Sequence, residues 1–248
     1  MAGHSKWAQI KHKKAVVDAR RGKLFAKLIR AVEVAARDAG TSNPELNMTL
    51  AAAFERAKSY SVPMDTIERA AKRGAGELEG VAYERVLYEG YGPNGVAVLA
   101  EALTDNRNRT GQDVRTAFSR AGGNLGEPGS VAWMFQQKGM LVVPGTASEE
   151  DVLLAAAEGG AEDATITDGA WEIVCEATAF AAVRDALQGA GLEIESAELT
   201  MLPTTTVPLD ADGARPVLRL MDALEDLDDI QNVYTNFDIP DEVLAEVS

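Results

Sequence analysis

The sequence predicts an α+β protein with several domains. An N-terminal helical bundle precedes two α/β sandwich modules of ferredoxin-like type, one of them inserted in the other. Residues 1–73 repeat apolar side chains at helical spacing, whereas the chain beyond residue 80 alternates β-rich and helical segments. A length of 248 residues also allows two or three separate cores. The predicted domains are residues 1–80, residues 81–128 with 203–248, and residues 129–202.

Three amphipathic helices are expected in the first domain, with ends marked by residues that favour helix termini. Gly40 is a typical residue at a helix C-terminus, and Ser42-Asn43-Pro44 offers a cap and a first-turn proline. Glycines at 74, 76 and 80 then indicate a hinge. The expected helices span residues 15–39, 44–59 and 63–73. The expected inward-facing side chains of the last two are Leu46, Leu50, Phe54, Ala57, Met64, Ile67 and Ala71.

The middle of the chain has the element order βαββαβ, which is the split βαβ order of a ferredoxin-like domain. These elements are expected at residues 139–143, 149–158, 162–167, 170–176, 179–189 and 193–201. The flanking elements are expected at 83–91, 95–103 and 110–121, and at 204–209, 214–227 and 230–237. Neither flank has enough strands to fill a sandwich alone, so we predict that both join into one discontinuous domain around the insertion.

Charge is sorted along the chain. Residues 1–73 contain 15 Lys and Arg against 7 Asp and Glu, whereas residues 74–248 contain 9 against 32. A protein with a net charge of −15 gains little from non-specific attraction to polyanions. A basic segment at one end therefore indicates a dedicated contact with nucleic acid, either DNA or RNA.

The candidate nucleic-acid-binding residues lie within residues 1–30. At about 100° per residue, the cations of the first helix fall on one stripe, which also includes Arg37, and its apolar residues fall on another. Trp7 has few apolar neighbours in the sequence, which favours base stacking over a core position. The alternative is a solvated basic face on a flexible tail. The predicted contact residues are Lys6, Trp7, Lys11, His12, Lys13, Lys14, Arg20, Arg21, Lys23, Lys27 and Arg30.

Arg107 and Arg109 form a second candidate phosphate site, in a polar loop before a helix that Thr110 is expected to cap. Pairing of these arginines with Asp105 or Asp113 is an equal alternative, in which they only fix the loop. The acidic run at residues 222–229 is expected to be a solvated helix face. A second interpretation is that this run screens the basic domain and discourages wrong polyanions.

Six segments of the chain carry long, specific motifs: residues 1–7 (MAGHSKW), 10–14 (IKHKK), 22–30 (GKLFAKLIR), 104–110 (TDNRNRT), 129–135 (GSVAWMF) and 232–240 (NVYTNFDIP). These segments closely resemble the YebC family. The resemblance spans the whole chain and implies three domains, the first of them helical. It also implies a cytoplasmic DNA-binding transcriptional regulator. The alternative that it carries is a translation factor associated with the ribosome and with ribosomal or transfer RNA, since mitochondrial relatives act as translational activators.

The sequence assigns no catalytic, cofactor-binding or metal-ligating residue, so we expect no enzyme, no cofactor and no small-molecule substrate. Both histidines lie in the basic start, and Cys175 is expected on the apolar face of a strand. Residues 90–95 fit G-x-G-x-x-G, but a strand follows them where a dinucleotide site needs a helix. Residues 209–213 begin like a calcium loop without its later acid, and a hairpin-type turn is expected instead.

No apolar run approaches the roughly 18–20 residues that a membrane span needs, and no apolar stretch follows the basic start as in a secretory signal. A single cysteine excludes a disulfide within the chain, which fits a reducing compartment. We therefore expect a cytoplasmic protein without a membrane partner.

Overall fold

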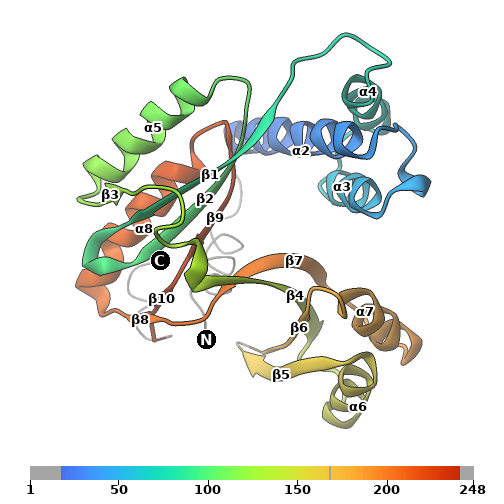
Figure 1. The fold of residues 1–248 in the computed structure, drawn as a ribbon. Coiled ribbons are helices and arrows are strands. Elements are labelled where there is room, and N and C mark those ends of the chain that lie inside the picture. Colours follow the sequence, from blue (N-terminus) through green and yellow to red (C-terminus); the bar gives the residue numbers. More distant parts are fainter. Residues whose placement is uncertain (1–17, 168, 241–248) are drawn as a thin grey trace. The chain divides into compact units, whose positions relative to one another are not determined.

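The computed structural model describes residues 18–167 and 169–240, with side chains from residue 22 onward (Figure 1). The chain divides into two compact units. The first consists of Met1–Ala132 with Thr206–Ser248, and the second is Trp133–Thr205. A helical region is followed by two mainly antiparallel sheets that pack against helices, so the predicted multidomain α+β class is confirmed.

The N-terminal part of the first unit is helical. It contains α2 (Asp18–Ala39), the 3₁₀ turn η1 (Pro44–Leu46), α3 (Met48–Ser59) and α4 (Met64–Gly74). α2 ends at Gly40, whose φ of 66° lies in the left-handed region, as predicted for this glycine. The three α-helices share one apolar core, formed by Leu28, Val32, Ala35, Ala36, Leu50, Phe54, Ala57, Val62, Ile67, Ala70 and Ala71.

The predicted inner face is wrong at two positions. Leu46 is 72% exposed and Met64 is 49% exposed, whereas the other five predicted side chains are buried. The reason is that the expected second helix is interrupted. Asn43 caps only η1, and Asn47 then accepts a hydrogen bond from the Leu50 amide to begin α3 afresh. Leu46 therefore lies before the continuous helix, and Met64 lies at the first residue of α4, where the helix has not yet reached the core.

Gly74 is a packing residue and not part of a hinge. A Cβ on Gly74 would lie 2.0 Å from the carbonyl oxygen of Glu33 in α2, which is closer than any side chain permits. The glycine lets the end of α4 contact the α2 backbone directly. Gly76 has a φ of 79°, which explains a glycine at the turn that follows α4.

The rest of the first unit is built from both sides of the insertion. Its sheet has the order β3-β1-β2-β9, from Asn124–Leu125, Glu84–Tyr91, Ala97–Thr104 and Ile230–Thr235. Strand β2 pairs antiparallel with β9, which comes from beyond the insertion. The short strands β8 (Val207–Pro208) and β10 (Phe237–Asp238) form a parallel pair. Helices α5 (Arg107–Arg120) and α8 (Ala211–Glu225) share a core with β2 through buried residues such as Val98, Phe118 and Leu220.

The inserted unit has the predicted ferredoxin-like topology. Its elements are β4 (Phe135–Pro144), α6 (Glu149–Gly159), β5 (Ala161–Thr167), β6 (Ala170–Glu176), α7 (Phe180–Gly189) and β7 (Ser196–Pro203), preceded by the turn η3 (Ala132–Met134). The strand order is β5-β6-β4-β7, with every pair antiparallel. Cys175 is fully buried in the core between this sheet and its helices, as predicted, and burial raises the pKa of its thiol.

Two predicted helix starts are wrong because aspartate and asparagine cap both helices earlier. Asn106 accepts a hydrogen bond from the Arg109 amide, so α5 begins at Arg107 and Thr110 lies inside its first turn. Asp210 accepts from the Gly213 amide and caps α8, so this segment is a helix N-terminus and not a hairpin-type turn. The glycine-rich turn at residues 90–95 leads into strand β2, as expected.

Candidate nucleic-acid interface

The predicted contact residues divide into two groups by their place in the chain. Lys6, Trp7, Lys11, His12, Lys13 and Lys14 lie outside the described residues, and so do the side chains of Arg20 and Arg21. Lys23, Lys27 and Arg30 lie on α2 and have defined neighbours. Their stripe on the helix exists as predicted, but it faces another part of the protein.

The cations of α2 bind the C-terminal end of α8. Lys23 Nζ donates to the carbonyl oxygen of Asp226 at 3.1 Å, and Lys27 Nζ donates to that of Glu225 at 2.6 Å. Arg30 Nη1 donates to the carbonyl oxygen of Asp228 at 2.8 Å. The last carbonyls of a helix lack partners within the helix and carry its negative dipole end, so cations are favoured there. The expectation of a row of cations facing solvent is therefore wrong for Lys27 and Arg30, which are partly buried.

The same contacts change the prediction for the acidic run at residues 222–229. Its end was expected to be a solvated face, yet it contacts the basic helix through three backbone carbonyls. The carboxylates of Asp226 and Asp228 remain exposed beside this contact. The second interpretation, that this run screens the basic domain or repels wrong polyanions, stays a prediction.

Asp229 is the centre of a buried polar network that the sequence analysis did not identify. Its carboxylate lies 3.0 Å from Arg30 Nη1 and 2.8 Å from Arg109 Nη2, and it accepts a hydrogen bond of 2.6 Å from Thr110 Oγ1. Thr104 Oγ1 donates to it at 3.2 Å. The network joins α2, β2, α5 and the turn before β9. In the sequence, Asp229 is one of several acids after α8, and nothing distinguishes it from its neighbours.

The charge state of Asp229 follows from these contacts. Burial by itself raises the pKa of the carboxyl, but hydrogen bonds from Arg109 and Thr110 and the charge of Arg30 outweigh that effect. The pKa is therefore lowered, and the carboxylate is ionised at neutral pH. A buried anion with two arginine partners holds the helical part of the unit against its sheet.

The two arginines of the second candidate site have different surroundings. Arg109 pairs with Asp105 at 2.8 Å as well as with Asp229, so the loop-fixing alternative describes it. Arg107 forms only a 3.6 Å pair with Glu84, and both side chains are more than half exposed. Arg107 thus keeps a charge that faces solvent, whereas the charge of Arg109 is neutralised within the protein.

A small pocket of about 220 Å³ lies between α2, α4 and the segment that leads to β1. Its charged lining consists of Glu33, Arg37 and Arg73. Arg73 pairs with the buried Glu33 at 3.0 Å, and Arg37 donates to the Tyr83 carbonyl oxygen. Arg30 lies 4.8 Å above the centre of the Tyr83 ring. Internal partners therefore hold the charged side chains of this pocket.

Within the described ranges, no group of three or more His, Cys, Asp or Glu side chains is arranged to hold a metal ion. None of the helices in the described part of the chain is both long enough and apolar enough to cross a membrane.

Comparison with known proteins agrees with this architecture. The family model described as TACO1/YebC second and third domain matches residues 83–237, and the model for the TACO1/YebC N-terminal domain matches residues 5–77. The chain belongs to the TACO1/YebC family. The N-terminal match covers the basic segment and the helical bundle, and the second match covers both the discontinuous part and the insertion.

Relatives of this TACO1/YebC chain match it from end to end. A protein of Thermobifida fusca is 59% identical over 251 residues, covering 100% of both chains. One of Streptomyces avermitilis is 55% identical over 249 residues, covering 100% of this chain and 99% of the relative. Both are named probable transcriptional regulatory protein. The crystal structure of a conserved hypothetical protein from Aquifex aeolicus is 50% identical, with a TM-score of 0.84 over 95% of this chain and 97% of that one.

Proposed function

We propose that this TACO1/YebC protein is a non-enzymatic, nucleic-acid-binding regulator of gene expression that acts in the cytoplasm as a DNA-binding transcriptional regulator. The observation that carries the proposal is the concentration of positive charge at the N-terminal end of the sequence. Of the net charge of +8 in residues 1–73, +5 lies in residues 1–21. The names of the relatives, as probable transcriptional regulatory proteins, support the same function.

The contact is proposed to run through Lys6, Trp7, Lys11, His12, Lys13, Lys14, Arg20 and Arg21, and to extend to Lys23, Lys27 and Arg30. Lys23 is exposed and is the first cation of α2 whose side chain the structure describes, so a phosphate can reach it. Lys27 and Arg30 already bind carbonyl oxygens at the end of α8, so a phosphate has to compete with these oxygens for them.

The electrostatic part of this proposal predicts a strong dependence on salt. If six to eight phosphates are neutralised, log K should fall against log salt with a slope of roughly −4 to −7. The test replaces Lys11, Lys13 and Lys14 with Ala in the full chain and measures binding to duplex DNA by fluorescence anisotropy. We expect affinity to fall at least tenfold and the slope to become shallower by about 2–3.

A matched control removes the same charge elsewhere. Arg56, Lys58 and Lys72 are exposed on α3 and α4, and their replacement by Ala changes the net charge equally. Affinity within twofold of the unmodified protein is expected for this control. Equal losses in the two triple variants would show that only net charge matters, and the proposal for the N-terminal segment would be wrong.

A second candidate function, a ribosome-associated translation factor, is favoured by the α2–α8 contact. A helix that reads the major groove needs a free cationic face, but the face of α2 is occupied by the end of α8. A basic segment that contains Trp7 suits unpaired RNA bases, on which an indole stacks. Sedimentation of the cellular protein with ribosomes at low and high salt separates the two functions. A ribosome-bound pool that disappears in the Lys11, Lys13 and Lys14 variant indicates translation, whereas a promoter footprint without such a pool indicates transcription.

A further inference from the structure

A groove of about 410 Å³ runs along α5 where this helix faces β1 and β3. Its polar lining comes from Arg107, Asn108, Gln112 and Arg115 on one side of the helix. Tyr88 and Leu125 supply apolar surface, and Gly111 leaves space between the polar side chains. All of these residues belong to the first unit, and none of them lies in the basic N-terminal segment.

The groove has positive charge in an acidic part of the protein. Helix α5 carries four of the nine Lys and Arg residues that follow residue 73, with Asp113 as its only acid. Of the described residues, none forms an ion pair with Arg115. The pair between Arg107 and Glu84 is long at 3.6 Å and exposed, and such pairs contribute roughly 0–1 kcal/mol. An anionic ligand could therefore displace Glu84 at little cost.

The spacing of the two arginines suits a polyanion. Positions 107 and 115 are separated by two helical turns, or about 12 Å of rise. Successive phosphates along one strand of a duplex rise about 3.4 Å and also turn around the axis, so two phosphates about two nucleotides apart lie at a comparable direct distance. Asn108 and Gln112 lie between the arginines and offer amide donors.

We propose that this groove is a second nucleic-acid contact, in which Arg107 and Arg115 each bind a backbone phosphate while Asn108 and Gln112 donate hydrogen bonds to the strand between them. The apolar surface of Tyr88 and Leu125 receives sugar or base. The inference rests on the proposed function, because it adds a second anchor to the N-terminal contact. A strand that is bound at one contact is held close to the other, which raises its effective concentration there and strengthens binding overall.

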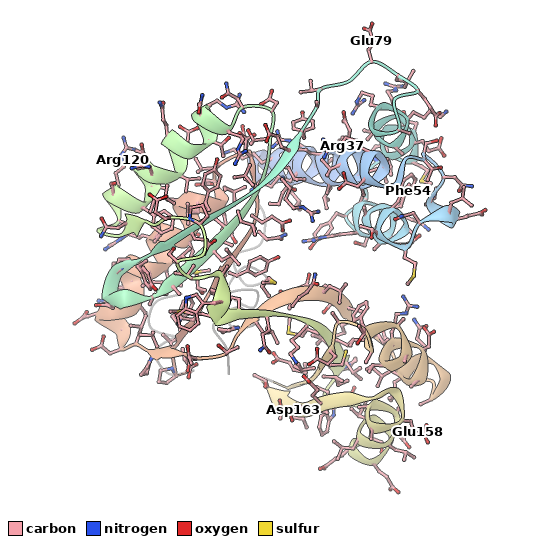
Figure 2. All side chains as sticks on the ribbon, in the orientation of Figure 1. Arg37, Phe54, Glu79, Arg120, Glu158 and Asp163 are labelled. Atoms are coloured by element: carbon pink, nitrogen blue, oxygen red, sulfur yellow. The ribbon has the colours of Figure 1, made fainter. Side chains whose placement is uncertain are left out.

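The test uses the full chain and a charge-matched control. Arg107→Gln with Arg115→Gln removes both groove cations. Arg120→Gln with Arg219→Gln removes two exposed cations from α5 and α8 that do not line the groove. Figure 2 shows Arg120 at the C-terminal end of α5. Binding to fluorescent single-stranded RNA and duplex DNA is measured by anisotropy over a salt series, with polyglutamate as a competitor.

For the groove variant we expect an affinity at least tenfold lower and a salt slope shallower by about 1.4–1.8, since each phosphate contact contributes roughly 0.7–0.9. The control should stay within twofold. Equal losses in the two variants would overturn the inference. A second result would also overturn it: the groove variant binds nucleic acid as well as the unmodified protein does, but polyglutamate no longer competes. The groove would then bind an acidic protein segment.

A second variant tests the groove without changing charge. A Cβ on Gly111 would lie 3.7 Å from the Tyr88 ring and hydroxyl, which is ordinary contact, so Gly111→Ala should fold normally. Gly111→Leu should fill the groove and weaken binding at least fivefold relative to Gly111→Ala. Unchanged binding in Gly111→Leu contradicts the inference.

The failure of the inference and that of the proposed function give different results. If the Lys11, Lys13 and Lys14 variant loses binding while both groove variants retain it, the groove inference is wrong and the N-terminal contact stands. If the unmodified protein binds neither RNA nor DNA, both are wrong.

Discussion

Helices α2 and α5 both carry a row of cations, but their surroundings use the two rows in opposite ways. On α2, Lys23, Lys27 and Arg30 donate hydrogen bonds to the end of α8, and Arg30 also pairs with Asp229. On α5, Arg109 is neutralised internally, whereas Arg107 and Arg115 line an exposed groove. A cationic stripe in a sequence therefore shows where charge is available, and the tertiary neighbours decide whether it binds an external polyanion.

The physical difference lies in what faces each row. The α2 row faces the C-terminal end of a helix, where unpaired carbonyls and several carboxylates attract cations. The exposed row on α5 lines a groove with Tyr88 and Leu125, whose side chains carry no negative charge to neutralise it.

The largest effect is expected from Asp229→Ala. It leaves Arg30, Thr104, Arg109 and Thr110 without their shared acceptor, and breaking a buried pair by removing one partner costs about 3–5 kcal/mol. Urea unfolding followed by circular dichroism measures the loss of unfolding free energy. Asp226→Ala removes an exposed carboxylate nearby and should change the free energy by less than about 0.5 kcal/mol. Equal effects would show that Asp229 has no special role.

The same carboxyl should make stability depend on pH. The pKa of Asp229 is lowered in the folded protein, so its contribution is fully present above the unfolded pKa of about 3.9 and is lost as pH falls through the folded value. The difference in unfolding free energy between the unmodified protein and Asp229→Asn should therefore be constant from pH 7 to about 5 and shrink towards pH 3. A difference that is independent of pH over this range would contradict the assigned ionised state.

A smaller effect is expected at the contact between α2 and α8. Lys27→Ala removes the 2.6 Å hydrogen bond to the Glu225 carbonyl and should cost about 1 kcal/mol. Lys58→Ala is the control, because Lys58 is an exposed cation of α3 and its 3.6 Å pair with Glu55 contributes little. This variant should keep its free energy of unfolding within about 0.5 kcal/mol of that of the unmodified protein. Thermal unfolding of both variants measures the difference. Equal melting temperatures would mean that the α2 row adds no stability.

The smallest effect concerns the acids beside the α2 row. Asp226→Asn with Asp228→Asn removes two exposed carboxylates but keeps the backbone carbonyls that bind Lys23 and Arg30. If these acids repel wrong polyanions, non-specific affinity for nucleic acid should rise about two- to threefold in anisotropy measurements. Glu45→Gln with Glu68→Gln provides the control with the same charge change on exposed helix surface. An unaltered affinity in the first variant would discard the screening interpretation.

Periodicity predicted most of the fold because the helices and strands of this chain bury regular apolar faces. The βαββαβ insertion is confirmed in full by its strand order, and Cys175 lies in the core where alternation indicated it. The predicted helix starts are wrong where a short polar side chain caps the helix at another residue. Asn47, Asn106 and Asp210 each begin a helix at a residue that apolar spacing did not indicate.

The amino-acid sequence by itself determined the α+β class, the inserted module and the separation of basic from acidic segments. These properties depend on composition and on local periodicity, which can be read from the sequence alone. Only the tertiary structure decided which cations are paired with groups inside the protein. Asp229 is 199 residues from Arg30 and 120 residues from Arg109, and no local pattern reports a pairing at such a separation. Folding brings these charges together in a site where burial strengthens their attraction, and the cations left exposed are those available to a partner.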